Sequence, residues 1–223
     1  MDNIIELKDV TKSYGKLVKT EILHNINLNI ERHSFNSIIG ASGSGKSTIL
    51  NIMGTLDRPT NGQVHINGKC TNSMKKDELA ELRNKTIGFI FQFHYLLPEF
   101  TVLENILMPY LISNSKPDEK ILKSAEELLY MVGIDKVKNN MATNLSGGQQ
   151  QRAAIARALI NNPDIILADE PTGNLDSKST ESVYELLREI NRKFKTTFVI
   201  ITHDSRIAKR TNRIIEINDG RIC

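Results

Sequence analysis

The residues best suited to chemistry in this sequence form a glycine-rich run, GASGSGKST, at positions 40–48. An apolar run, 35–39, precedes it, and a helix-compatible segment, 49–53, follows it. In a strand–turn–helix context, G-x-x-x-x-G-K-[ST] predicts a phosphate-binding loop, because backbone N–H groups and the helix N-terminus converge on one anion. Lys46 would reach the β- and γ-phosphates, and the Ser47 hydroxyl would ligate Mg²⁺. The residues expected to bind ATP are Gly40, Ala41, Ser42, Gly43, Ser44, Gly45, Lys46, Ser47 and Thr48.

Polar side chains follow three apolar runs that read as strands. One of these runs ends in Asp169 and Glu170, and the other two end at His203 and Gln92. Because chemistry in parallel sheets collects at the carboxyl ends of the strands, we expect these side chains to share one edge. Asp169 would hold Mg²⁺, while Glu170, pointing to the other face by strand alternation, would orient and deprotonate an attacking water. The plainer alternatives are a solvated turn at the two carboxylates and a structural role for His203.

A second glycine-containing run, LSGGQ, occupies residues 145–149 and precedes an alanine-rich helical segment, 153–160. A serine and two glycines before a helix leave backbone N–H groups free for an anion. Two such helix starts in one chain suggest a nucleotide held from two sides. The alternative is a flexible linker with a helix cap.

The elements that must position these groups alternate along the chain. Strands are expected over residues 4–8, 26–30, 62–68, 86–91, 164–169, 198–203 and 213–217. Helices are expected over 76–83, 121–132 with Pro117 at the first helical position, 153–160, 183–194 and 206–210. Residues 13–15 read as a turn. This alternation predicts an α/β fold with a mostly parallel sheet, interrupted by a helical insertion near 93–160.

Composition narrows the class of protein. The chain has 223 residues, with 29 basic and 26 acidic side chains and a net charge of +3. Such a balanced charge gives little electrostatic basis for binding nucleic acid. The sequence contains no apolar stretch near the ~20 residues that a bilayer span needs, and we expect no secretion signal at its start. Its two cysteines, Cys70 and Cys223, suggest reduced thiols in a cytosolic protein.

Together these motifs resemble the ATP-binding cassette (ABC) ATPases over essentially the whole chain, with LSGGQ as the family's signature sequence. The resemblance implies one P-loop NTPase domain, 1–223, with an N-terminal antiparallel β subdomain. Its nucleotide-binding core would be 1–92 and 161–223, and its helical subdomain 93–160. The resemblance implies that Glu170 and His203 are catalytic and that the Tyr14 ring stacks on the adenine. It implies that Mg²⁺ is contacted by Ser47, Asp169 and Gln92, and that Gln92 also contacts the transmembrane partner. The residues implied to make contact across a dimer are Ser146, Gly147, Gly148, Gln149 and Asp176. The family closes as a head-to-tail homodimer on ATP and opens after hydrolysis.

The segment 91–106, FQFHYLLPEFTVLENI, bears on the branch of the family. Its aromatic and leucine residues fit either a partner-docking surface or the insertion's own core. The segment is similar to that of the lipoprotein-releasing (LolD-type) ATPases, within a group that includes MacB-like macrolide and haem exporters and FtsE-like cell-division ATPases. This resemblance implies an ATPase at the cytoplasmic face of a bacterial inner membrane, peripherally bound to LolC/LolE-like permeases. Drug or haem export, or a regulatory role without transport, is the alternative.

Overall fold

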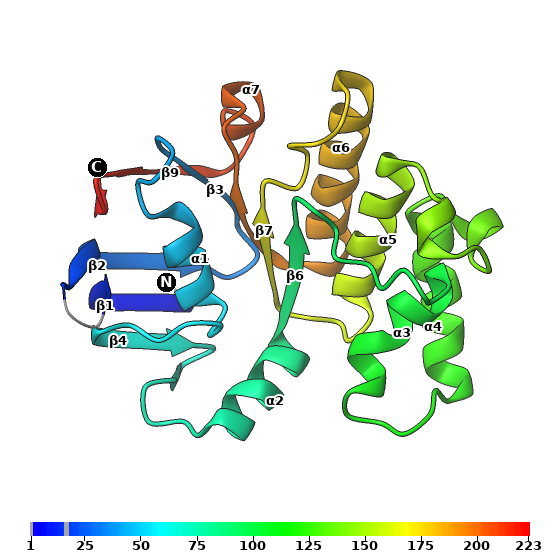
Figure 1. The fold of residues 1–223 in the computed structure, drawn as a ribbon, viewed down its shortest axis with the longest axis horizontal. Helices are drawn as coiled ribbons and strands as arrows, with labels where there is room; N and C mark the ends of the chain where they lie inside the picture. The colour runs from blue at the N-terminus through cyan, green and yellow to red at the C-terminus, as the bar shows by residue number, and fades with distance from the viewer. Residues whose placement is uncertain (1, 16–17) are drawn as a thin grey trace.

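Two β-sheets and the helices around them form the fold (Figure 1). The computed structural model describes residues 2–15 and 18–223. An antiparallel sheet, in the order β2-β1-β4-β5, contains β1 (Asn3–Tyr14), β2 (Thr20–Glu31), β4 (Asn61–Ile66) and β5 (Lys69–Cys70). A second sheet, in the order β10-β9-β3-β8-β7-β6, contains β3 (Phe35–Ile39), β6 (Ile87–Phe91), β7 (Ile165–Asp169), β8 (Thr197–Ile201), β9 (Arg213–Asn218) and β10 (Arg221–Ile222).

The second sheet is parallel apart from its edge strand β10, which pairs antiparallel with β9. Its central strands are buried along their length, as apolar runs covered on both faces should be. Parallel pairing brings the carboxyl ends of β3, β7 and β8 to one edge, where the candidate site residues begin. The expected α/β P-loop fold with a mostly parallel sheet and an antiparallel β subdomain is confirmed.

The antiparallel sheet is longer than its sequence pattern indicates. Ser13 and Tyr14 belong to β1 and pair with β2, so the turn expected at residues 13–15 is wrong for these two residues. The register between the two strands shifts at several points, and Asp9, within the shift between Leu7 and Val10, has a φ of +52°. Each shift breaks the alternation of apolar and polar residues, which is why the pattern alone shortens the strand.

The helices of the first half are α1 (Lys46–Met53), α2 (Lys76–Thr86), α3 (Val102–Leu111) and α4 (Glu119–Met131). They are followed by the short turns η1 (Asp135–Val137) and η2 (Ala142–Asn144), then α5 (Gly147–Leu159), α6 (Ser177–Phe194) and α7 (Ser205–Ala208). Pro117 does not open α4 as expected. Asp118 caps this helix instead, accepting a hydrogen bond from the Ile121 N–H at 2.8 Å, because a carboxylate satisfies a free N–H that proline cannot.

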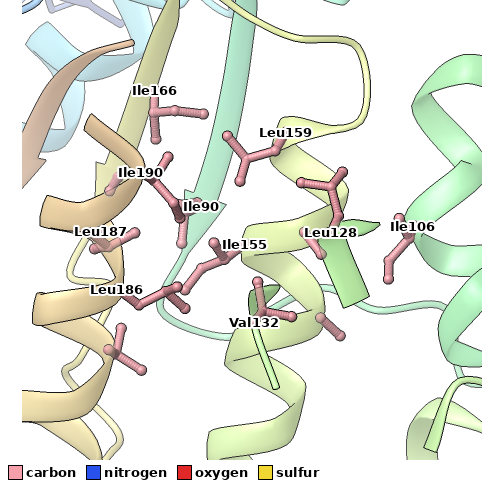
Figure 2. Close-up of a cluster of buried hydrophobic side chains, with 14 of the residues drawn as sticks. Ile90, Ile106, Leu128, Val132, Ile155, Leu159, Ile166, Leu186, Leu187 and Ile190 are labelled. Atoms are coloured by element: carbon pink, nitrogen blue, oxygen red, sulfur yellow. The ribbon is translucent and has the colours of Figure 1, made fainter. Parts of the chain in front are cut away.

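Two apolar clusters cover the two faces of the parallel sheet. In one, α5 lies between the sheet and the helices α3 and α4, and Ile155 and Leu159 of α5 belong to the cluster (Figure 2). The other cluster joins α1 and the antiparallel sheet to the opposite face. Along β8, Phe198 belongs to the first cluster and Val199 to the second, as the two-residue period of a strand requires. The two helices that start with glycine-rich turns, α1 and α5, therefore lie on opposite faces.

Candidate nucleotide site

The loop between β3 and α1 requires glycine at two positions. Gly40 has a φ of +152°, and a Cβ there would lie 2.1 Å from the Ile217 carbonyl oxygen. Gly45, directly before α1, has a φ of +103°, and a Cβ would meet a Leu23 methyl carbon at 2.7 Å. Both positions combine a left-handed conformation with close packing, so the loop can curl around a ligand only with these residues.

Lys46 lies at the start of α1 and folds back over the loop. Its ammonium donates to the Gly40 carbonyl at 2.9 Å and to the Ala41 carbonyl at 2.6 Å. The Ser44 hydroxyl is buried and has no hydrogen-bond partner among residues 2–15 and 18–223. A buried hydroxyl without a partner costs about 1–3 kcal/mol. A cation at the helix N-terminus suits a phosphate group, whereas Ser44 is not among the described residues that line the pocket over this loop.

A pocket of about 530 Å³ opens over this loop and is called the nucleotide pocket below. Its walls combine the loop with residues from the ends of β1, β7 and β8. The lining residues are Tyr14, Ile22, Gly40, Ser42, Gly43, Gly45, Lys46, Ser47, Thr48, Asp169, Glu170, Ile201 and His203. Three distant segments of the chain therefore meet the phosphate loop at one site.

Asp169, the last residue of β7, lies beside Ser47 at the floor of the pocket. Burial raises the pKa of Asp169 above its ordinary value; the negative charge of Glu170 adds to this, while a hydrogen bond from Ser47 and the charge of Lys46 oppose it. A carboxylate and a hydroxyl in contact make an oxygen donor pair of the kind that a hard divalent cation prefers.

Glu170 follows β7 in a left-handed conformation with a φ of +46°. Its N–H donates to the Ile201 carbonyl at 3.1 Å, and its Oε2 lies 3.1 Å from Nδ1 of His203. Strand alternation predicts that Glu170 points away from Asp169, but Glu170 lies beyond the end of β7, so alternation does not set its direction, and both residues line the nucleotide pocket. The strand has ended, and the positive φ turns the chain at this residue.

Tyr14 lies at the rim of the pocket and is 44% exposed. Its hydroxyl donates to Oδ2 of Asp57 at 2.6 Å, and the Lys12 ammonium lies 4.7 Å from the centre of its ring. Lys12 also donates to Oδ1 of Asp57 at 2.6 Å. Sequence reasoning missed Lys12 and Asp57, because they meet 45 residues apart through side chains that no local pattern reports.

Gln92 follows β6 but is not among the described residues that line the nucleotide pocket. Its amide donates to Oδ1 of Asn174 at 3.2 Å, and Nδ2 of Asn174 donates back to the Gln92 carbonyl at 3.2 Å. This pair ties the end of β6 to the loop after β7. Gln92 thus lies at the carboxyl edge of the sheet, held toward Asn174.

The LSGGQ run forms the start of α5. The Ser146 hydroxyl accepts from the Gln149 N–H at 3.3 Å, and Oε1 of Gln149 accepts from the Ser146 N–H at 3.0 Å. A Cβ at Gly147 would meet nothing within 4 Å, so the space beside this residue is open. Within the described chain, none of residues 145–149 lines the nucleotide pocket. This helix start therefore lies apart from the nucleotide pocket of its own chain.

Asp176 caps α6. Its Oδ1 accepts from the N–H groups of Lys178 and Ser179, both at 3.0 Å, and its Oδ2 accepts from the Ser179 hydroxyl at 2.6 Å. These bonds hold the pKa of Asp176 below its ordinary value, the hydroxyl of Ser179 contributing most. The carboxylate is thereby fixed at the surface next to the loop that follows Glu170.

The loop between β3 and α1, together with Asp169 and Glu170 at the end of a neighbouring parallel strand, defines a P-loop nucleoside triphosphatase. The family model for the ABC transporter matches residues 23–173. The chain belongs to the ABC transporter family and is an ATPase of that class.

Two curated relatives match the chain over nearly all of both lengths. The lipoprotein-releasing system ATP-binding protein LolD 1 of Rhodopseudomonas palustris is 51% identical over 225 residues, covering 100% of each. The LolD of Anaeromyxobacter dehalogenans is 49% identical over 220 residues, covering 98% of this chain and 92% of that protein.

A solved structure of the ATP-binding cassette MJ0796, a dimer in a post-hydrolysis state bound to ADP and Pi, superposes with a TM-score of 0.90. It is 46% identical in sequence, and the match covers 98% of this chain and 96% of that one. Among the helices described here, none is long and apolar enough to cross a bilayer.

Proposed function

We propose that this chain is the ATP-hydrolysing subunit of a bacterial ABC complex that releases lipoproteins from the inner membrane toward the outer membrane. The observation that carries the proposal is the full-length similarity to two lipoprotein-releasing ATP-binding proteins, at 51% and 49% identity. In this role the chain binds peripherally at the cytoplasmic face, and LolC/LolE-like permease subunits supply the membrane-spanning part.

Within the nucleotide pocket, the loop N–H groups and Lys46 bind the phosphates, and the Tyr14 ring stacks on the adenine. Glu170 takes the proton of the attacking water. His203 lies within hydrogen-bond reach of the Glu170 carboxylate and holds that carboxylate in place. Ser47 and Asp169 offer oxygens that suit Mg²⁺, with Gln92 nearby at the same sheet edge. A Mg²⁺ ion held by these oxygens would neutralise negative charge on the phosphates of the nucleotide.

The second half of the site comes from another copy of the chain. The start of α5, Ser146 to Gln149, is open and lies apart from the residues that line its own nucleotide pocket. The free N–H groups of this helix start suit the γ-phosphate held by the partner, and Asp176 reaches the same interface. The dimeric MJ0796 cassette supports this arrangement. ATP therefore bridges two subunits, and its hydrolysis lets them part.

The permease docks beside the segment 91–106. A groove of about 470 Å³ lies between α2, β6, α3 and α5, with Phe91 and Tyr95 in its wall. Phe93 is 66% exposed and Tyr95 is 61% exposed, whereas Ile106 in the same segment is buried in the core. The segment thus has a core part and a surface part, and the surface part fits an apolar element of a partner.

Co-purification and reconstitution test the proposal. The chain, expressed in its native host, should retain a four-span permease and, in proteoliposomes with it, release a lipoprotein on addition of ATP. Tyr95→Ala should lower permease retention, while Tyr130→Ala, on the exposed surface of α4, should not. Retention of cell-wall hydrolase regulators with no ATP-dependent release would overturn the proposal in favour of a regulatory ATPase.

A further inference from the structure

In the protein without nucleotide, both the hydroxyl and the ring of Tyr14 are held by neighbouring side chains. Its hydroxyl donates to Asp57 at 2.6 Å, and the Lys12 ammonium lies over its ring. Lys12 is 9% exposed and is itself held by Asp57 and by the Arg58 carbonyl at 2.7 Å. A rim residue that is 44% exposed would otherwise sample several rotamers.

The anchor is a charged one. Burial works against the charge of Asp57, but hydrogen bonds from Lys12, Tyr14 and the Arg58 N–H outweigh it and keep its pKa below the ordinary value. Asp57 is therefore an anion, which accepts from a tyrosine hydroxyl more strongly than a neutral group does. Since Lys12 covers one ring face, a base has the other face to stack on.

Asp57 also ties the base side of the site to its phosphate side. It lies in the turn after α1, where its N–H donates to the Asn51 carbonyl at 3.2 Å. The other end of α1 carries Lys46 and Ser47. One short helix thus sets the distance between the phosphate loop and the residue that fixes the Tyr14 ring.

From this geometry we propose that Asp57 and Lys12 are positioning residues that hold the Tyr14 ring in its base-stacking orientation in the free protein. The proposal rests on the adenine stacking of Tyr14 given above. Because the ring is already ordered, binding does not have to immobilise it, and affinity for the base rises accordingly. The Lys46 ammonium, in contrast, is held by the Gly40 and Ala41 carbonyls of the phosphate loop.

Binding of ADP and of pyrophosphate by the full chain, measured by titration calorimetry, separates the two parts of the site. Tyr14→Phe removes the hydroxyl, which donates to Asp57 and also interacts with the Thr48 side chain, and should weaken ADP binding by roughly three- to tenfold, the loss expected for freeing one side chain. Pyrophosphate, which has no base, should bind as to the wild type. Tyr130→Phe, on α4, is the matched control and should leave both unchanged.

Double variants test whether Asp57 acts through Tyr14. Asp57→Ala should weaken ADP binding in the wild type and cause a smaller loss in the Tyr14→Phe chain, where only the contact through Lys12 is left to lose. Lys12→Met keeps the Tyr14–Asp57 hydrogen bond and gives a second measurement if Asp57→Ala does not fold. This variant should lower the affinity for ADP and leave the affinity for pyrophosphate unchanged. Equal weakening of ADP and pyrophosphate would show a merely structural role and overturn the proposal.

Tyr14→Ala distinguishes failure of the positioning proposal from failure of the stacking on which it rests. If Tyr14→Ala weakens ADP binding but Tyr14→Phe does not, stacking stands and positioning by Asp57 is wrong. If Tyr14→Ala binds ADP as the wild type does, the adenine does not stack on Tyr14, and both are wrong.

Discussion

At the scale of single residues, the turn at Glu170 decides what the carboxylate can reach. A positive φ in a non-glycine residue is uncommon, and here it brings Glu170 into the same pocket as Asp169 and within 3.1 Å of His203. The residue that we propose as general base therefore depends on backbone conformation as well as on its side chain.

Glu170→Gln should keep ATP binding and lower the turnover number by about 10²–10⁴-fold, because the amide cannot take the proton of the attacking water. Phosphate release measures the rate, and titration with a fluorescent ATP analogue measures binding. Lys46→Ala is the contrasting control and should lose binding itself, since it removes the cation at the phosphate loop. Normal turnover in Glu170→Gln would exclude this residue as the base.

At the scale of elements, α5 is the helix on which both proposed interfaces depend. Its first residues form the open helix start at 146–149. Its last turn lies against β6, beside the groove that we propose as the permease docking site. Gly88 in β6 permits this packing, since a Cβ there would lie 2.4 Å from the Ala158 carbonyl oxygen and 2.6 Å from an Ile166 methyl carbon. The contact fixes how closely the helix approaches the sheet.

Gly88→Ala should destabilise the chain by about 1–3 kcal/mol, the usual cost of overpacking a filled core. Chemical denaturation followed by circular dichroism measures this free energy. Tyr130→Ala, which truncates an exposed side chain on α4, should change it by less than about 0.5 kcal/mol. An unchanged midpoint for Gly88→Ala would mean that α5 can move away from β6 at no cost.

Sequence reasoning predicted those elements whose cause is local. The glycines at 40 and 45 are required by the backbone at their own positions, so the phosphate loop could be predicted from its spacing. The long β1 could not, because its register shifts hide the alternation, and neither could the capping of α4 by Asp118 in place of Pro117. Contacts such as that of Lys12 with Asp57 depend on the folded chain and leave no periodic signal.

At the scale of the whole molecule, the chain has two helix starts of the kind that suits an anion, and they belong to helices that pack on opposite faces of the parallel sheet. The nucleotide pocket leads into α1 on one face of the sheet, and α5 packs on the other. Because none of residues 145–149 is among the described residues that line the nucleotide pocket, we propose that a second copy brings its own helix start to the triphosphate, and two copies related by a twofold axis would do this twice. Each hydrogen bond to a charged phosphate contributes about 1.5–3 kcal/mol, so several of them suffice to hold two subunits together.

Disulfide trapping tests this closure. In a chain with Cys70 and Cys223 replaced by serine, Ser42→Cys and Ser146→Cys should crosslink between two copies when ATP is present and Glu170→Gln prevents hydrolysis. Without ATP the crosslink should be weak, because nothing bridges the two surfaces. Gel mobility under non-reducing conditions reports the product.

Mixing two single variants shows whether the partner residues come from different copies. One chain carries only Ser42→Cys and the other only Ser146→Cys, so a disulfide between these positions requires two molecules. With ATP present, we expect a disulfide between the two different chains. If the Ser42→Cys chain also carries Lys46→Ala, we expect no disulfide, because that chain has lost its phosphate site. A crosslink that forms equally without ATP would mean that the two copies meet for another reason, and no crosslink at all would mean that the open start of α5 serves something other than the partner's nucleotide.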